Sequence, residues 1–340
     1  MQKHQNWIAK MPRIVPYYEI RMVMKLGVPP NRIIFANPAK WTTHIKFAKT
    51  MNVKKMTVDS EMEIIKIKDI FPEAKVIIRI RCDAKNVLVS LGTKFGCDPD
   101  EEAVRLIHLT KSLGLKLWGF SFHVGSLCSE SDAYVRGIRT CKKLISIAKE
   151  IGCKDVQLID IGGGFPGNRG YSIDEIARCI NNEIEDIDPS ISIISEPGQY
   201  YATSAYTLVS LVHTKKVVRQ ANGMVRMYYM NCGVYNGFIE EMLNLKERLP
   251  IPVYKPASDA KFLSYVWGPT LDSMDCILKN VMLPEFHQGD WLAWMDIGSY
   301  SICLSTSFNG FAPPKVHPCA RKSQWKKFID YTKRMQKSQE

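Results

Sequence analysis

Long apolar runs and a recognisable targeting segment are missing from this sequence of 340 residues. No apolar run approaches the ~18 residues that a membrane-spanning helix needs, so we expect a protein that has no membrane partner. The first twelve residues, MQKHQNWIAKMP, show neither an apolar core nor a cleavage-site pattern, which predicts that no secretory signal is present. Both absences favour a cytoplasmic protein.

Paired cysteines are also missing, because none of the ten cysteines forms a CxxC motif. Their scattered spacing is not that of a zinc site. In a chain of this length it also argues against a disulfide framework. We therefore expect reduced thiols and no bound metal.

No nucleic-acid-binding motif accompanies the net charge of +12, although such a charge fits either nucleic acid or an acidic protein partner. Much of the excess is local, since residues 319–340 hold seven Lys and Arg against two acids. We interpret this segment as a solvated basic helix or a disordered end, and we expect no nucleic-acid partner.

What the sequence does contain is a regular alternation of apolar runs and helical patterns from residue 31 to about 200. The apolar runs are continuous, as in a parallel sheet buried on both faces. Repeated βα units of this length predict a (β/α) barrel or a doubly wound sheet. After residue 204 the pattern changes to strands with few helices between them, at 206–218, 225–231, 290–298 and 301–308.

The length is enough for roughly two domains. We predict an α/β protein in which a barrel is followed by a β-rich domain. The expected boundaries are an N-terminal extension at 1–10, the barrel at 11–204, the β-domain at 205–318 and a basic tail at 319–340.

The stretch VPYYEIRMVMKLGV, residues 15–28, joins two patterns without a turn. Residues 14–18 are apolar, aromatic and β-branched, which predicts a buried strand. Residues 19–27 predict an amphipathic helix closed by a glycine. Because a strand-to-helix connection commonly has about 2–6 residues, a segment is missing at this junction or the junction is unusually tight.

Polar and glycine residues follow several apolar runs, where the active sites of barrels lie. They are Arg79, the FHVGS segment at 122–126, the DIGGGFPG segment at 160–167 and the SEPGQYY segment at 195–201. Gly162 to Gly164 would either direct backbone amides at an anion, most often phosphate, or form only a tight turn. His123 is either a packed or a functional histidine. Glu196 points to function, since an acid there is costly without a partner.

Six motifs in this order resemble one family: FHVGS, LIDIGGGFPG, SEPGQYY, YYMNCGVYNGF, WGPTLDSMD and GDWLAWMDIGSYSICLSTSFNGF. From about residue 11 to 315 the chain is similar to eukaryotic ornithine decarboxylases and to their inactive relatives, the antizyme inhibitors. The resemblance implies an eight-stranded βα barrel, a β-domain and a head-to-tail dimer. It also implies pyridoxal phosphate (PLP), carried by a lysine as a Schiff base.

The resemblance assigns cofactor-binding roles to eight residues. Glu196 would pair with the ring nitrogen, Arg79 would face the phenolic oxygen, and Asp160 would support the site from behind. The others would stack on the ring (His123) or hold the phosphate (Ser126, Gly163, Gly164 and, from the β-domain, Tyr300).

The resemblance also implies a homodimer, or a heterodimer with a related decarboxylase. Asp272 lies in the segment that enters the partner's active site in this family, which makes it a candidate catalytic residue. Phe308 matches an interface aromatic, and two charged pairs match links between subunits: Lys94 with Asp275, and Asp59 with Lys215. Each pair could instead be a surface salt bridge of little energetic value.

The chain departs from the family where the cofactor lysine is expected, because it reads PYYEIR in place of PFYAVK. Either Arg21 replaces the lysine, or the segment that holds the lysine is absent; the smooth continuation of the helix favours an absent segment. In both cases the Schiff base is lost, since a guanidinium stays protonated.

Three further departures fall on site positions. Leu271 replaces the proton-donating cysteine, Cys232 replaces the aspartate that binds the far amine of ornithine, and Gln199 replaces an arginine near the phosphate. A neutral thiol would not pair with a second ammonium. These changes indicate lost decarboxylation or a substrate without a second amine.

Three hypotheses follow for the function. The protein is a PLP-dependent amino-acid decarboxylase, impaired in the chain as given, or a non-catalytic regulator that binds antizyme, or a fragment with unpaired sheet edges. The segment 40–64 aligns with the antizyme-binding element of the family and is basic, which suits an acidic partner. The alternative for this segment is an ordinary exposed βα unit.

Overall fold

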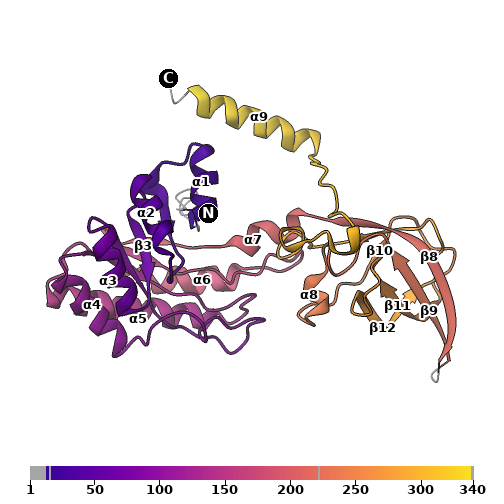
Figure 1. Ribbon diagram of the computed structural model, residues 1–340, viewed down its shortest axis with the longest axis horizontal. Coiled ribbons are helices and arrows are strands. Elements are labelled where there is room, and N and C mark those ends of the chain that lie inside the picture. Colours follow the sequence, from indigo (N-terminus) through magenta and orange to yellow (C-terminus); the bar gives the residue numbers. More distant parts are fainter. Residues whose placement is uncertain (1–12, 15–16, 221–222, 338–340) are drawn as a thin grey trace. The chain divides into compact units, whose positions relative to one another are not determined.

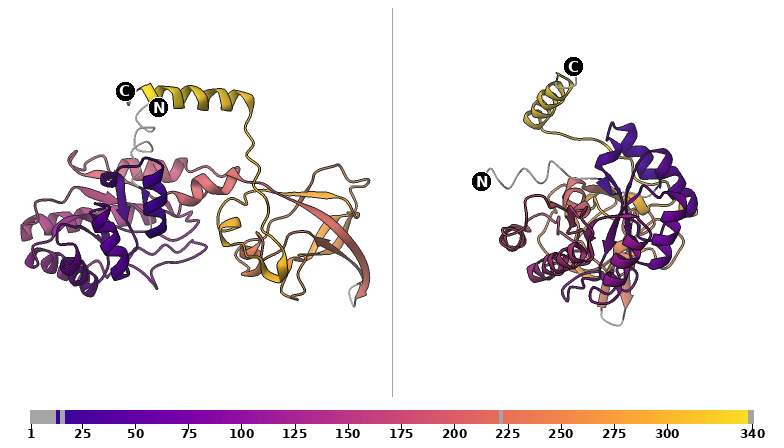
Figure 2. Two further views of the ribbon diagram at one scale, coloured as in Figure 1. Left: turned by 45° about the horizontal axis from the view of Figure 1, so that its top comes forward. Right: turned by 90° about the vertical axis from the view of Figure 1, so that its left-hand side faces the viewer.

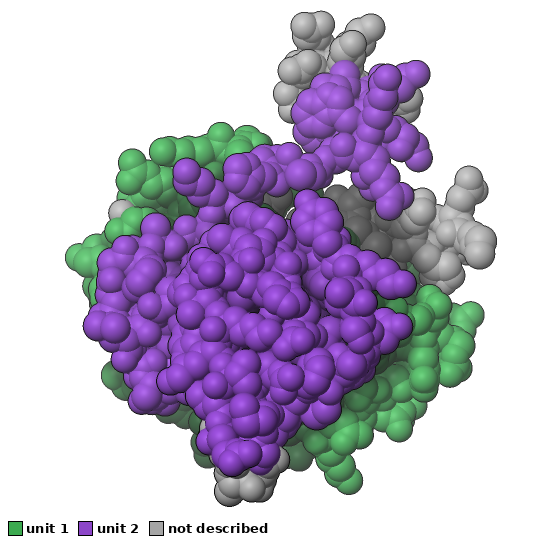
Figure 3. Space-filling view, turned by 90° about the vertical axis from the view of Figure 1, so that its right-hand side faces the viewer, with its two compact units in different colours: residues 1–207, 296–299 green, residues 208–295, 300–340 purple. Residues whose placement is uncertain are grey.

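The computed structural model describes residues 13–14, 17–220 and 223–337. The chain divides into two compact units, drawn in different colours in Figure 3. Unit 1 comprises the chain up to residue 207 together with 296–299, and unit 2 comprises 208–295 and the chain from residue 300 onward. No helix among the described residues is long and apolar enough to cross a membrane.

Unit 1 is a parallel sheet whose strands follow one another in sequence order, with helices between them (Figure 1). Its strands are β1 (Arg13–Ile14), β2 (Ile33–Phe35), β3 (Lys55–Val58), β4 (Lys75–Arg79), β5 (Lys116–Ser121), β6 (Leu158–Asp160) and β7 (Ser192–Ile194). Its α-helices are α1 (Tyr17–Lys25), α2 (Thr42–Thr50), α3 (Glu61–Ile70), α4 (Glu102–Ser112), α5 (Ser131–Ile151), α6 (Asp174–Glu183) and α7 (Gly198–Ala202). Short 3₁₀ helices are η3 (Pro30–Arg32) and η4 (Thr203–Ala205).

The sheet of unit 1 is an incomplete barrel, since β1 and β7 stand at its two edges. This confirms the predicted α/β class and a (β/α) barrel that is incomplete on its N-terminal side, followed by a β-rich domain. The right-hand view of Figure 2 shows the helices around the outer side of the strands.

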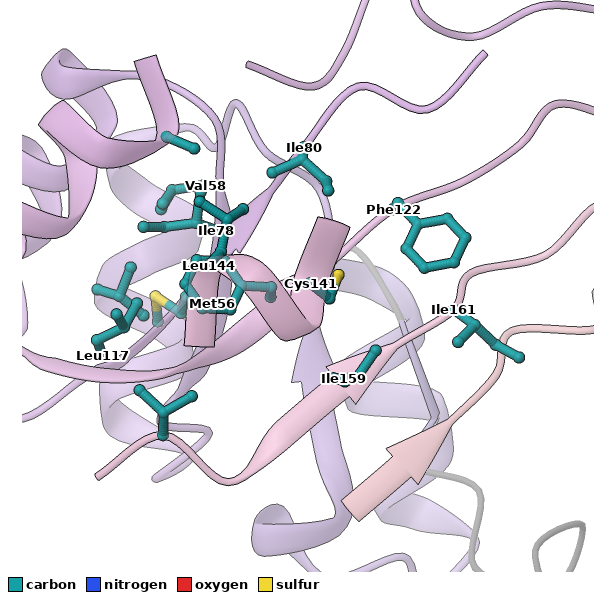
Figure 4. Packing of buried hydrophobic residues seen from close by; sticks show 14 of the residues in the cluster. Met56, Val58, Ile78, Ile80, Leu117, Phe122, Cys141, Leu144, Ile159 and Ile161 are labelled. Atoms are coloured by element: carbon teal, nitrogen blue, oxygen red, sulfur yellow. The ribbon is translucent and has the colours of Figure 1, made fainter. Parts of the chain in front are cut away.

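Alternate residues of each strand face the helices and the inside of the barrel. Met56, Ile78 and Leu117 belong to the large cluster between sheet and helices, part of which Figure 4 shows. A smaller apolar cluster lies on the inner face, formed by Ile34, Ile77, Leu158 and Ile194 with Trp118 against it. Because both faces are apolar, the strands are continuous apolar runs in the sequence.

The junction between the first strand and the first helix differs from the prediction. The strand predicted at 14–18 is wrong at Tyr17 and Tyr18, because α1 already begins at Tyr17; residues 15 and 16 lie outside the described part. Helix α1 buries Ile20 and Val23, which lie three positions apart on one face, and it packs against α2. This amphipathic burial favours a helix that begins two residues earlier than predicted, over residues whose aromatic character favoured a strand.

Unit 2 is built on a six-stranded sheet with the order β10-β13-β8-β9-β11-β12, antiparallel except between β9 and β11. Its strands are β8 (Leu208–Gln220), β9 (Gly223–Met230), β10 (Ile251–Pro252), β11 (Lys261–Trp267), β12 (Cys276–Pro284) and β13 (Trp291–Trp294). It also contains the short helix α8 (Ile239–Met242) and the C-terminal helix α9 (Lys322–Lys337), so the basic tail is largely helical.

The strand predicted at 301–308 is wrong. This stretch forms the 3₁₀ helices η5 (Ile302–Leu304) and η6 (Phe308–Gly310). The Nδ2 of Asn236 donates to the carbonyls of Thr306 and Phe311, each at 3.2 Å, which satisfies two acceptors that a strand would have used in a ladder.

A buried ion pair fixes the segment between β2 and α3. The Lys40 ammonium lies 3.0 Å from Oε1 of Glu63 and donates to the carbonyls of Asn37 (3.0 Å) and Thr57 (2.6 Å). The second carboxylate oxygen of Glu63 lies 2.6 Å from Nζ of Lys66. Burial lowers the pKa of Lys40 to about 8, against the opposing effect of the Glu63 charge. The pair therefore ties α3 to the loop after β2 and is costly to break.

We expect Glu63→Gln to destabilise the protein by about 3–5 kcal/mol, because it leaves the buried Lys40 ammonium without its counter-charge. Urea unfolding measures this loss. Glu61→Gln is the matched control, since Glu61 is exposed on the same helix and lies 3.7 Å from Arg105 in a surface pair. Equal, small effects of both substitutions would contradict the assigned role of Glu63.

Candidate functional site

Strand register brings polar side chains together at the carboxyl ends of β4, β5 and β6. Arg79 pairs with Ser121, Ser121 with Asp160, and Asp160 with Ile194 of β7. Residues paired across parallel strands lie on the same face, and Ile194 belongs to the inner cluster. Arg79, Ser121 and Asp160 therefore form a polar row on the inner face of the barrel, beyond its apolar middle.

Two acids meet at this edge. Asp160 is fully buried; its Oδ1 accepts a hydrogen bond from the Gly162 amide at 3.0 Å, and its carboxyl group hydrogen-bonds with that of Glu196. Burial and the neighbouring Glu196 carboxyl raise the pKa of Asp160 well above its usual range. Burial also raises the pKa of Glu196. The hydrogen bond with Asp160 and the charge of Arg79 both lower this pKa and so oppose the effect of burial. Asp160 therefore holds its proton to higher pH and can donate it in a hydrogen bond to the Glu196 carboxylate.

Arg79 supplies the positive charge of the cluster. Its guanidinium lies 5.2 Å from the centre of the Phe95 ring. Burial lowers the pKa of Arg79, and the charges of Glu196, Asp59 and Asp160 oppose this effect. Because arginine stays protonated in proteins, Arg79 balances one carboxylate of the site.

His123 follows β5 and is held as a neutral ring. Its Nδ1 accepts a hydrogen bond from the Gly125 amide at 3.1 Å, which places the proton of the neutral ring on Nε2. Burial, together with the charge of Arg79, lowers the pKa of His123 to about 4. At neutral pH the ring is thus uncharged and is fixed by the loop that carries Ser126.

The glycines allow two loops to pack closely. A Cβ atom on Gly162 would lie 2.1 Å from the Phe122 carbonyl oxygen, and one on Gly164 would lie 2.3 Å from that of Gly125. At Gly163 a Cβ would lie 2.9 Å from Nε2 of His123. The glycines are therefore required by the contact of the loop at 162–164 with the loop at 123–126, and any anion site they form would be built on this contact.

Four further residues singled out in the sequence belong to unit 2. Asp272 accepts hydrogen bonds from the Tyr235 hydroxyl and, at 3.0 Å, from the Met274 amide, which lower the pKa of Asp272. The backbone of Tyr300 has a φ of 48°, in the left-handed region. Leu271 is 94% exposed. Burial raises the pKa of Cys232 to about 12, so this thiol is neutral.

Three of the four charged residues predicted to link subunits already have polar partners within their own units. Asp275 is buried, and its carboxylate accepts hydrogen bonds from the amides of Val234 (2.8 Å) and Thr270 (3.0 Å). Lys215 lies 2.7 Å from Glu285, and Asp59 accepts a hydrogen bond from the Gly96 amide at 2.9 Å. Phe308 packs against Tyr235, with 4.5 Å between ring centres. The pairing of these residues across a dimer stays a prediction.

Sequence reasoning missed several polar groups of unit 1. The hydroxyls of Thr57, Ser121 and Ser195 are buried and have no hydrogen-bond partner among the described residues. Tyr134 on α5 donates to the Gly163 carbonyl at 3.1 Å and so supports the glycine loop. Asp59, which comes directly after an apolar strand, carried the same signal as Arg79 and Glu196 and could have been found by it.

No group of three or more His, Cys, Asp or Glu residues in the described part of the chain could hold a metal ion. All ten cysteines are free thiols.

Comparison with known proteins gives consistent matches. Residues 11–203 match the family described as pyridoxal-dependent decarboxylase, pyridoxal binding domain. Ornithine decarboxylase 2 of Drosophila melanogaster is 37% identical, over 93% of this chain and 88% of its own length. Antizyme inhibitor 2 of Xenopus laevis is 36% identical, over 96% of this chain and 80% of its own length.

Two solved structures are similar over most of the chain. The arginine decarboxylase of Paramecium bursaria Chlorella virus has a TM-score of 0.82 and 35% identity, and covers 88% of this chain and 80% of its own. A SrLDC mutant in complex with PLP has a TM-score of 0.83 and 29% identity, and the match covers 94% of this chain and 82% of the SrLDC chain.

The alignment with the Drosophila relative spans 348 positions, more than the 340 residues of this chain. That relative therefore contains residues without a counterpart here, and the segment that the sequence analysis expects to be absent stays a prediction.

We expect NMR to show that the Cε1 proton of His123 titrates near pH 4, well below the ordinary pKa of about 6.5. Because the folded pKa is the lower one, His123 contributes stability that is lost as pH falls from the ordinary pKa to the folded one. Arg79→Met removes a nearby positive charge and is expected to raise the pKa of His123. The resonance of His123 is assigned by its absence from the spectrum of the His123→Gln variant. Titration of this resonance near the ordinary pKa would contradict the conclusion that the His123 ring is neutral.

Proposed function

This chain belongs to the pyridoxal-dependent decarboxylase family that includes the ornithine decarboxylases, and we propose that it holds PLP without the covalent bond on which decarboxylation depends. PLP is the cofactor of this family's binding domain, and when bound it supplies an electron sink for the charge left after loss of carbon dioxide. The observation that carries the proposal is the cluster of Arg79, His123, Asp160 and Glu196, which is assembled although the cofactor lysine is lacking.

The residues of unit 1 fit this cofactor. The buried Ser121 hydroxyl of the same polar row has no partner among the described residues, and the two glycine-rich loops leave no room for side chains at 162–164. The Glu196 carboxylate would hold a proton on the ring nitrogen, with Asp160 donating to Glu196 from behind. Arg79 would face the phenolic oxygen.

The other cofactor-binding roles fall to the loops. The neutral ring of His123 would stack on the pyridine without placing a second cation beside Arg79. Ser126, Gly163 and Gly164 would bind the phosphate, and Tyr300 of unit 2 is proposed to reach it as well. Gln199 provides no charge for the phosphate, so we expect weaker retention than an arginine would give.

No lysine stands where a covalent bond to the cofactor is expected. The sequence has none between Lys10 and Lys25, and Arg21 and Lys25 are exposed on α1. Lys40 follows β2, but its ammonium is enclosed by Glu63 and backbone carbonyls. The chain as given is therefore proposed to be catalytically impaired.

Two changes in unit 2 disfavour ornithine as a substrate in any longer form of the protein. The neutral Cys232 thiol offers no charge to a second ammonium, and Leu271 has no proton to give to a carbanion. Asp272, held by Tyr235 and Met274, retains the carboxylate of the segment that we propose to enter a partner's active site.

We expect the full chain to bind PLP reversibly and to give no reduced adduct with borohydride, because no lysine forms the Schiff base. Absorbance titration measures PLP binding, and mass spectrometry of the reduced protein detects any adduct. Release of carbon dioxide from ornithine, lysine and arginine measures decarboxylation. Glu196→Gln is expected to weaken PLP binding about tenfold, through loss of a charge-assisted hydrogen bond. Glu175→Gln, an exposed acid on α6, serves as the control. A reduced adduct on any lysine would overturn the non-covalent assignment.

A second candidate function is antizyme binding through residues 40–64, as in the family element. The observation that favours it is an exposed apolar surface on α2 and α3: Trp41 is 73% exposed and stacks on His44, and Met62 is 74% exposed. Exposed aromatic side chains of this kind are typical anchors of protein interfaces. In this reading the protein would act in the cytosol, as a regulator that forms a dimer with itself or with a related decarboxylase.

Trp41→Ala is expected to weaken antizyme binding about thirtyfold, the effect of losing an interfacial hot spot of about 2 kcal/mol. Biolayer interferometry with immobilised antizyme measures it. Tyr171→Ala removes an exposed aromatic of unit 1 outside the segment and is expected to leave binding unchanged. Failure of the unaltered chain to bind antizyme would exclude the regulatory function while leaving PLP binding untouched.

A further inference from the structure

The amino ends of three neighbouring strands in unit 1 each carry a lysine at the same register position. Lys55 of β3 pairs with Lys75 of β4, and Lys75 pairs with Lys116 of β5. The residues that follow them, Met56, Val76 and Leu117, belong to the cluster under the helices, so the three lysines face the inner side of the sheet. Like charges at paired positions are unfavourable, so this lysine row has an energetic cost that the fold itself does not require.

The partners of the lysine row are few. Nζ of Lys75 lies 3.5 Å from the centre of the Trp118 ring, and Nζ of Lys55 donates to the Asn31 carbonyl at 2.8 Å. Nζ of Lys116 lies 3.9 Å from the Asp155 carboxylate. Each ammonium has three donors, so these contacts leave donors on every lysine for another acceptor.

The charge of the row is concentrated and only partly balanced. Burial lowers the pKa of Lys75, and the charges of Lys116 and Lys54 lower it further, against Asp155. Burial and the charge of Lys75 likewise lower the pKa of Lys55. Asp155 is the acid beside Lys75 and Lys116, while Lys55 has the cation Lys75 as its charged neighbour, an arrangement that an anion would stabilise.

The lysine row is separate from the cluster proposed to hold PLP. Lys75 begins β4 and Arg79 ends it, so the two sites lie about 13 Å apart along one strand at the usual rise per residue. The apolar row that contains Ile77 and Leu158 lies between them.

We propose that Lys55, Lys75 and Lys116, with Lys54 beside them, bind a polyphosphate group at the amino end of the barrel. Lysine binds phosphate as a point charge. Because one phosphate group carries at most about two negative charges at neutral pH, it cannot balance all the ammonium groups of the row, whereas a chain of phosphoryl groups can. The ligand class is therefore an inorganic polyphosphate or the polyphosphate chain of a small molecule. This inference does not depend on the proposed function.

Isothermal titration of the full chain with inorganic phosphate, pyrophosphate, tripolyphosphate and ATP tests the proposal. Affinity is expected to rise with the number of phosphoryl groups and to fall with added salt. If ATP binds and its binding is weakened by the same lysine substitutions, the polyphosphate group is that of a nucleotide. If tripolyphosphate binds and ATP does not, the ligand is an inorganic polyphosphate.

Lys116→Ala is expected to weaken tripolyphosphate binding about tenfold or more, and Asp155→Asn to strengthen it. Both side chains are largely exposed, so these variants keep the fold, which circular dichroism checks. Lys143→Ala is the matched control, because Lys143 forms an exposed pair with Asp100 at 2.9 Å on another part of unit 1. Equal loss with Lys143→Ala, or tighter binding of a polyglutamate peptide than of tripolyphosphate, would overturn the proposal.

Discussion

The register of the parallel strands is the constraint on which unit 1 depends. With a period of two residues, each strand turns one set of side chains to the helices and the other to the inside. The same alternation that buries Met56 and Ile78 under the helices places Arg79, Ser121 and Asp160 in one row. A slip of one residue would move Arg79 and Asp160 into the apolar layer, at the cost of both the core and the site.

Along β4, the inner face changes from cationic to apolar to cationic within five residues, at Lys75, Ile77 and Arg79. The two polar ends differ in their balance of charge. At the carboxyl end Arg79 faces Asp160 and Glu196, so positive and negative charges offset one another, and burial with the Glu196 charge raises the pKa of Asp160. At the amino end the lysines have Asp155 as their counter-charge and depress one another's proton affinity. One strand therefore supports two sites of different electrostatic character, one with balanced charges and one with an excess of positive charge.

Much of this arrangement could be predicted from the sequence. The continuous apolar runs predicted β2 to β7, and the strand ends located Arg79, His123, Asp160 and Glu196. Ser121 could not be located in this way, because a hydroxyl within an apolar run carries no mark of the face on which it lies. The lysine row was equally hidden, since Lys55, Lys75 and Lys116 are far apart in the chain and meet only through register.

The failures have physical causes. Tyr17 and Tyr18 favour a strand intrinsically, but burial of Ile20 and Val23 against α2 favours one continuous helix. Residues 301–308 alternate like a strand, yet the amide of Asn236 binds carbonyls of that region and bends it away from a ladder. In both places tertiary contacts outweigh local preference.

The edges of the sheet in unit 1 determine how strongly an open barrel tends to aggregate. Opening a barrel normally exposes backbone that can template pairing with other chains. Here β7, the edge strand at the carboxyl side of the sheet, is only three residues long, so it offers few free backbone groups to a neighbouring chain. Such brevity limits growth of a cross-β stack from this edge, and it lets an open barrel avoid acting as a seed for aggregation.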